Sequence, residues 1–284
     1  MISKLKIAIF LIVSVIFTAS LSMAQDEVPD YLYDRGEGVT ASLFGTYIKK
    51  GDLVVYPFYE YELNTAEEYK GVEVGTSKDT KDYLGRFELH QLLIFLGYGV
   101  TDDLALEFET ALYETATLEK ASDDTTSGMT EDLEESGFGE TEVQLRWRLM
   151  REGENRPEVY TFVDVAFPFQ EDKKLIGISD WEGGIGLGLV KGFSFGTLTP
   201  RASIEYDPDD DAFEFGEWAI EYLKRFSDKW RMVATFEGES DEVSLIGEAQ
   251  YNLNPDAILK LNCGFGLTEK TPDIAPEIGV MFYF

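Results

Sequence analysis

The feature that most constrains the fold is a strict alternation of side chains over residues 140–149. Polar residues occupy every second position, namely Glu140, Glu142, Gln144, Arg146 and Arg148. Between them stand Thr141, Val143, Leu145, Trp147 and Leu149. Successive side chains of a β-strand point to opposite faces, so this segment is expected to be a strand with one apolar and one polar face.

Segments of similar length and pattern continue to the end of the chain. We expect twelve strands, at 52–63, 86–98, 103–115, 139–150, 157–168, 181–191, 197–206, 214–225, 230–239, 243–253, 257–267 and 276–284. The turns at 101–103, 151–156, 227–229 and 254–256 are tight, whereas the connections at 64–85, 116–138, 169–180, 207–213 and 268–275 are mostly longer and acidic. An even strand number keeps both termini on the side of the short turns. Fourteen strands are the alternative, if residues 31–33 also pair.

The polar faces of these strands indicate a lumen inside a membrane. After residue 24, no apolar run approaches the roughly 20 residues that a membrane-spanning helix needs. A charged side chain on the lipid face of a barrel costs about 2–4 kcal/mol at the midplane, so the charged faces should point inward. The expected fold class is therefore all-β, a transmembrane antiparallel β-barrel of about twelve strands.

Residues 1–24 have the pattern of a secretory signal peptide. Lys4 and Lys6 precede an apolar run over residues 7–17, and the small residues Ser22 and Ala24 suit cleavage near Ala24. We expect residues 25–50 to form a periplasmic lead-in or a partial plug, and residues 51–284 to form the barrel. The chain has 1 cysteine, so no internal disulfide can hold it.

The C-terminal strand resembles the terminal strand signal of bacterial outer-membrane barrels. That signal has a polar residue, a glycine two positions later, a hydrophobic residue three positions after that and a terminal aromatic. The matching residues here are Glu277, Gly279, Phe282 and Phe284. The resemblance implies an outer-membrane location, recognition by the barrel assembly machinery, and contact with outer-membrane lipid and lipopolysaccharide.

The strand phase predicts which side chains line the lumen. The predicted lining residues are Glu107, Glu109, Glu140, Glu142, Gln144, Arg146, Arg148, Asp164, Arg201, Glu217, Glu221, Arg231, Glu237, Glu248 and His90. Carboxylates outnumber bases in this set, so a water-filled lumen should favour cations. The alternative is a narrow lumen that these side chains fill with a salt-bridged network.

The strand at 86–98 has a different character from the others. The phase that points Arg86, Glu88 and His90 inward also points Leu92, Ile94 and Leu96 inward. These apolar residues could line a path for hydrophobic solutes, or they could pack against residues 38–48.

Several functional classes are disfavoured by composition. A formal net charge of -30 argues against nucleic acid as a partner. A membrane-embedded hydrolase would need His90, the 1 histidine, beside a serine nucleophile, but no G-x-S-x-G motif is present. We expect no enzymatic activity, no metal site and no cofactor.

The middle of the chain resembles a family of transport barrels. Residues 98–106 (Y-G-V-T-D-D-L-A-L) and 136–140 (S-G-F-G-E) are similar to stretches in the outer-membrane proteins named for the meta-pathway of phenol degradation. Glu140 stands where that family usually has Asp. The family is itself similar to transporters of long-chain fatty acids and aromatic hydrocarbons. The resemblance implies passive passage of a small, hydrophobic or aromatic solute; the alternative is a closed structural or surface-binding barrel.

Overall fold

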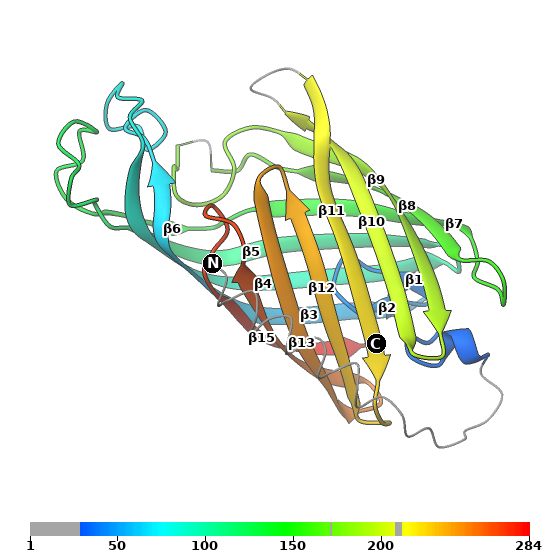
Figure 1. Cartoon of the computed structure of the whole chain (residues 1–284). Helices are drawn as coiled ribbons and strands as arrows, with labels where there is room; N and C mark the ends of the chain where they lie inside the picture. Colours follow the sequence, from blue (N-terminus) through cyan, green and yellow to red (C-terminus); the bar gives the residue numbers. More distant parts are fainter. Residues whose placement is uncertain (1–28, 171, 208–211) are drawn as a thin grey trace.

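The computed structural model describes residues 29–170, 172–207 and 212–284, and within them twelve strands close into an antiparallel barrel (Figure 1). These strands are β3 (Leu53–Tyr69), β4 (Tyr83–Thr101), β5 (Leu104–Leu118), β7 (Thr141–Met150), β8 (Glu158–Ala166), β9 (Glu182–Phe193), β10 (Gly196–Asp207), β11 (Ala212–Arg225), β12 (Trp230–Glu239), β13 (Glu242–Asn254), β14 (Ala257–Gly266) and β15 (Ala275–Tyr283). Each strand pairs with its neighbours, and β15 closes the barrel onto β3. The prediction of twelve strands is confirmed, and the alternative of fourteen is wrong.

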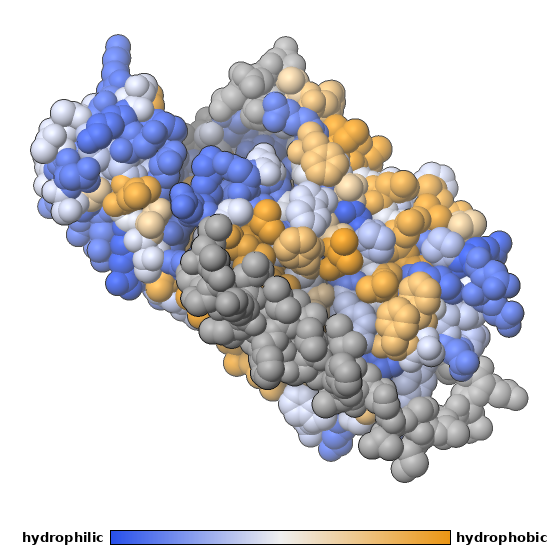
Figure 2. Space-filling model, viewed as in Figure 1, coloured by the Kyte–Doolittle hydropathy of each residue, from blue (hydrophilic) through white to orange (hydrophobic). Residues whose placement is uncertain are grey.

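The outer wall of the barrel is apolar. Exposed large hydrophobic side chains occupy alternate positions on the strands, among them Leu145, Trp147 and Leu149 on β7 and Ile185 and Leu187 on β9. In Figure 2 apolar residues spread over this wall, while hydrophilic residues gather toward both ends of the barrel. A barrel that faces lipid requires this distribution.

One side of the barrel rises above the rest as a tower. β3, β4 and β5 contain 17, 19 and 15 residues, which is more than the 9–11 that cross a bilayer. The short strand β6 (Leu133–Gly137) pairs with the far end of β5. The loops at 70–82 and 119–132 close over this end around a small core of Tyr69, Val74, Tyr83, Leu118, Ala121 and Met129 (Figure 1). We call these elements the outer tower.

The predicted phase of β4 is wrong. His90 is exposed on the outside, where its Nδ1 lies 2.6 Å from the hydroxyl oxygen of Tyr59, and Leu92 is also exposed. The inward residues are instead Leu89, Gln91 and Leu93. The prediction assumed that every charged residue must avoid lipid, but the end of β4 that carries Arg86, Glu88 and His90 belongs to the outer tower. Charged side chains there can point outward into water.

We call residues 29–50 the N-terminal insert, which begins at the end of the barrel beside β9 and places residues 38–48 inside the lumen (Figure 1). They contain the short 3₁₀-helix η1 (Asp30–Leu32) and a two-stranded hairpin of β1 (Val39–Thr40) and β2 (Tyr47–Ile48). Val39 and Ile48 are fully buried against inward side chains of the wall, among them Tyr56, Phe95 and Met281. Of the two alternatives for this strand, packing of residues 38–48 against β4 therefore occurs, but it involves Leu93 and Phe95 and not the predicted Leu92, Ile94 and Leu96.

Two further points concern chain segments. The expected signal peptide, residues 1–24, lies outside the described residues. No helix in the described part of the chain is long and apolar enough to cross a membrane.

Candidate functional site: the lumen and its N-terminal insert

The tip of the insert is held by polar side chains from four strands. The backbone N–H and hydroxyl of Ser42 donate to Oε2 of Glu107 at 3.0 and 2.5 Å, and the N–H of Gly45 donates to Oε2 of Glu221 at 3.0 Å. The carbonyl oxygen of Phe44 accepts hydrogen bonds from Nε2 of Gln250 at 3.1 Å and Nζ of Lys260 at 3.2 Å. Carboxylates thus meet backbone donors, and a cation and an amide meet the backbone acceptor.

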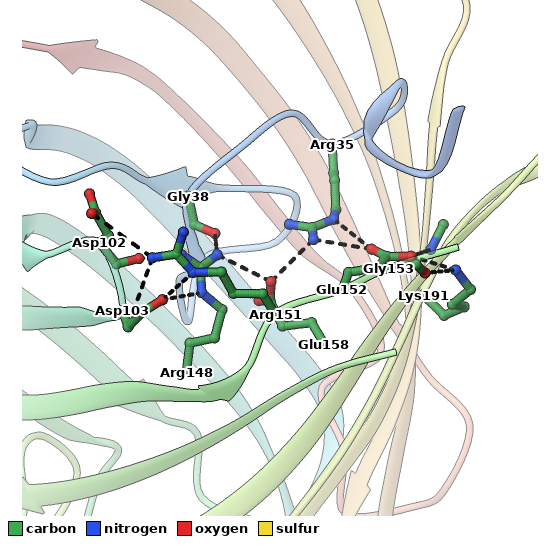
Figure 3. A network of polar contacts seen from close by, with 11 residues as sticks. Arg35, Gly38, Asp102, Asp103, Arg148, Arg151, Glu152, Gly153, Glu158 and Lys191 are labelled. Atoms are coloured by element: carbon green, nitrogen blue, oxygen red, sulfur yellow. Dashed lines mark hydrogen bonds and ion pairs between the residues drawn. The ribbon is translucent and has the colours of Figure 1, made fainter. Parts of the chain in front are cut away.

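The base of the insert is fixed by buried ion pairs (Figure 3). Nη2 of Arg35 lies 3.1 Å from Oε2 of Glu152 and 3.1 Å from Oε2 of Glu158, and all three side chains are at most 2% exposed. Arg148 donates to Oε2 of Glu158 and to the carbonyl oxygen of Gly38. The wall and the insert are therefore joined by largely buried charges.

On the outer side of the insert lies a cavity of about 380 Å³, which we call the outer vestibule. Its lining includes six glutamates: Glu60, Glu62, Glu109, Glu114, Glu140 and Glu142. Leu89, Leu93 and Ala111 add an apolar strip from β4 and β5. No lysine or arginine occurs among the described residues that line it.

A smaller cavity of about 140 Å³ lies where the vestibule meets the tip of the insert. Ser42 lines it from the insert, and Arg146 and Arg201 line it from the wall. Nε of Arg146 lies 3.4 Å from Oε1 of Glu107, and Arg201 pairs with Glu217. This cavity is therefore mixed in charge, unlike the vestibule above it.

The structure places the sequence-predicted lining residues in four groups. Glu109, Glu140 and Glu142 line the outer vestibule. Glu107, Gln144, Arg146, Arg201 and Glu217 surround the smaller cavity, with Glu237 3.8 Å from Arg201. Glu221 and Glu248 lie at the tip of the insert, where Glu248 pairs with Lys260 at 3.3 Å. Arg148 and Arg231 form the fourth group and lie toward the short turns. Two residues fall outside these groups: Asp164 faces inward beside Gly184, and His90 lies on the outside of the barrel.

Sequence reasoning missed two residues of β3 that line the vestibule. Glu60 and Glu62 lie opposite Gln91 and Leu89 of β4 and share their inward face. The signal was present, because Tyr59 and Tyr61 alternate with them on the outward face. Glu152, the buried ion-pair partner of Arg35, could not be found from strand alternation because it lies in a turn.

Comparison with known proteins shows the fold. No protein-family model matches the sequence, and no curated protein matches it. The structure is similar to an outer-membrane channel from Pseudomonas putida F1, with a TM-score of 0.60 and 13% identity over 87% of this chain and 100% of that chain. It is also similar to the translocator domain of the autotransporter NalP from Neisseria meningitidis, with a TM-score of 0.51 and 9% identity over 83% and 89% of the two chains. The fold is that of bacterial outer-membrane barrels.

Proposed function

We propose that this protein is an outer-membrane channel for passive passage of a small solute, and that its acidic vestibule favours cations. The observation that carries the proposal is the outer vestibule, a cavity lined by six glutamates without a basic residue among its described lining. A concave site with carboxylates of one sign attracts cations and repels anions. The apolar strip of Leu89, Leu93 and Ala111 is compatible with a solute that also has a hydrophobic or aromatic part.

The path runs from the vestibule along the insert toward the periplasm. At the other end, a cavity of about 1210 Å³ is lined by the insert and by wall residues such as Arg225, Arg231 and Phe284. In this proposal the insert acts as a partial plug between the two cavities, and diffusion past it determines the rate.

Single-channel recordings of the refolded mature protein in planar bilayers with KCl gradients test the proposal. We expect cation-selective steps whose selectivity weakens when Glu140 and Glu142 are both changed to Gln, because the field in the vestibule falls. The matched control is Glu134→Gln, an exposed glutamate on β6 of the outer tower. Anion-selective steps, or selectivity equal in the two variants, would contradict the acidic filter.

A closed structural or surface-binding barrel is the second candidate, and the buried ion pairs of the insert favour it. Replacing Arg35 by Met removes one of two cationic partners from each of the buried Glu152 and Glu158. Glu152 keeps Lys191 and Glu158 keeps Arg148, so the loss should be smaller than the about 3–5 kcal/mol of a buried charge left unpaired. If the insert closes a channel, Arg35→Met should raise conductance, whereas Lys49→Met, which removes an exposed 4.0 Å pair with Glu37, should not. A protein that stays silent in both variants while Arg35→Met loosens the insert toward protease is a structural barrel.

The ends of the chain bear on how the protein reaches the outer membrane. We propose that residues 1–24 are removed as a signal peptide near Ala24, and that the barrel assembly machinery reads Glu277, Gly279, Phe282 and Phe284. The outer face then contacts lipid and lipopolysaccharide. Mass spectrometry of the outer-membrane protein tests the cleavage, with Gln25 expected as the first residue.

A further inference from the structure

The loop between β8 and β9 enters the outer vestibule from the side. Its residues Leu175, Ile176 and Gly177 line the cavity together with the glutamates of the wall. Ile176 is only 4% exposed, and Leu175 packs against the core of the outer tower. We call residues 174–177 the strap. It adds apolar side chains to a cavity whose other lining is largely acidic.

The strap is fastened by two carboxylates that accept backbone hydrogen bonds. The N–H groups of Lys174 and Leu175 donate to Oε2 of Glu135 at 2.9 and 2.8 Å. The N–H of Gly177 donates to Oε2 of Glu114 at 3.2 Å. Hydrogen bonds to ionised acceptors are stronger than those between neutral groups, so the strap is held in one position.

The surrounding wall is shaped to receive this fastening. Glu114 is 2% exposed, and Gln91 of β4 also donates to it. A Cβ atom at Gly139 would lie 2.0 Å from the carboxyl carbon of Glu114, so glycine at this position makes room for the carboxylate. Gly177 itself has a φ of +64°, a conformation that other residues rarely adopt. The second glycine of the S-G-F-G-E stretch thus supports the anchor of the strap.

The strap lies on the outer side of Glu109, one of two vestibule glutamates that also line the smaller cavity below. Glu114 is paired with Gln91, whereas Glu109 is paired with Phe95, four residues further along β4 toward the insert. A solute that enters from outside and reaches Glu109 therefore passes the level of the strap.

We propose that the strap is the size filter of the outer vestibule, with Ile176 as the residue that sets the largest solute admitted. This inference rests on the proposed channel function, because a filter has meaning only where solutes enter. It assigns to Ile176 a role in specificity, and to Glu114 and Glu135 the role of positioning residues for the strap.

Cysteine accessibility tests the filter without requiring passage through the whole barrel. Glu109→Cys in a Cys263→Ser background gives a reporter below the strap, and Glu242→Cys gives a reporter at the exposed outer rim. The refolded full-length mature barrel is treated with aminoethyl methanethiosulfonate and with its bulky biotin-bearing derivative. The ratio of the two reaction rates measures size selection, and heat-modifiable gel mobility verifies that each variant is folded.

We expect the cysteine at position 109 to react with the small reagent and far more slowly with the bulky one, while position 242 reacts with both. Adding Ile176→Ala or Glu135→Ala should raise the bulky reagent's relative rate at position 109 by about tenfold or more, equivalent to a barrier change of about 1.4 kcal/mol. Glu134→Ala, which removes the exposed neighbour of Glu135, should leave the ratio unchanged.

The possible failures are distinguishable. If the small reagent does not reach position 109 in a folded barrel, the vestibule is closed and the proposed channel function fails. If the small reagent reacts but the ratio is the same with and without Ile176→Ala and Glu135→Ala, the channel proposal stands and the strap is not its filter. If the bulky reagent reacts freely at position 109 while the strap is intact, the strap is likewise not the filter and the channel proposal stands.

Discussion

The position of Gly45 imposes two requirements that only glycine meets: a left-handed backbone and no room for a Cβ atom. Its φ is +60°, and a Cβ atom there would lie 2.9 Å from Nε2 of Gln250 and 2.9 Å from Cγ2 of Val233. Left-handed backbone costs an L-residue about 1–2 kcal/mol, and overpacking costs about 1–3 kcal/mol more. We expect Gly45→Ala to destabilise the seated insert by about 2–5 kcal/mol, measured as faster native-state proteolysis of the insert in the folded barrel.

Two other glycines separate these contributions. Gly51 has a φ of +86° and open space around its Cβ position, so Gly51→Ala should show only the backbone cost. Gly247 has neither feature. Gly247→Ala should therefore change the stability of the seated insert, as measured by proteolysis, by no more than about 0.5 kcal/mol. Equal effects of the three substitutions would contradict the view that the insert's tip is closely packed.

At the scale of elements, the outer tower shows how a polar loop region can hold a fixed structure. Asp124, 6% exposed, accepts hydrogen bonds from the hydroxyl of Tyr69 at 2.8 Å and from the N–H groups of Thr126 and Ser127 at 3.2 and 3.0 Å. The hydroxyl of Ser127 donates to it as well. Burial acts to raise the pKa of this carboxyl, but these hydrogen bonds outweigh burial and lower the pKa to about 2. The ionised carboxylate therefore stabilises the tower.

This shift predicts a pH dependence for the tower alone. An unfolded aspartate has a pKa of about 3.9, so the stabilisation by Asp124 is complete above that pH and is lost as the pH falls from about 4 to about 2. We expect pepsin to cut the loops at 70–82 and 119–132 increasingly over this range, after correction for its activity on an unfolded substrate. Asp124→Asn should weaken the tower at neutral pH and flatten the dependence, whereas Asp123→Asn, at an exposed position, should preserve it.

The predictability of each element depends on its surroundings. The strands from β7 onward were predicted to within a few residues because lipid outside and polar side chains inside enforce a period of two. The same rule failed for β4, because the outer face of its tower end is in water and its inner face packs against the tower core. It also missed the short strand β6. The path of residues 38–48 inside the lumen depends on contacts with distant residues such as Glu107 and Glu221, which no local pattern encodes.

On the scale of the whole molecule, closure of the barrel depends on the last residues of the chain. β15 pairs with β3, and beyond β15 the N–H of Phe284 donates to the carbonyl oxygen of Leu53 at 2.9 Å while the N–H of Leu53 donates to that of Phe284 at 3.0 Å. The side chain of Phe284, however, is 73% exposed and contributes little packing. Its backbone serves closure, so its aromatic ring is available for another role.

In the proposed assembly route, that role is recognition during assembly, and a pair of substitutions separates recognition from folding. Phe284→Ala keeps both backbone hydrogen bonds with Leu53, so refolding of the purified protein into detergent should change by no more than about 0.5 kcal/mol. Phe213→Ala removes a ring of equal exposure, 72%, at the opposite end of the barrel on β11. We expect Phe284→Ala alone to lower the amount of folded barrel in the outer membrane of cells, measured by heat-modifiable mobility. Equal losses for both variants would mean that the terminal ring acts only as a lipid-facing side chain, and a loss confined to position 284 with normal refolding can come only from recognition.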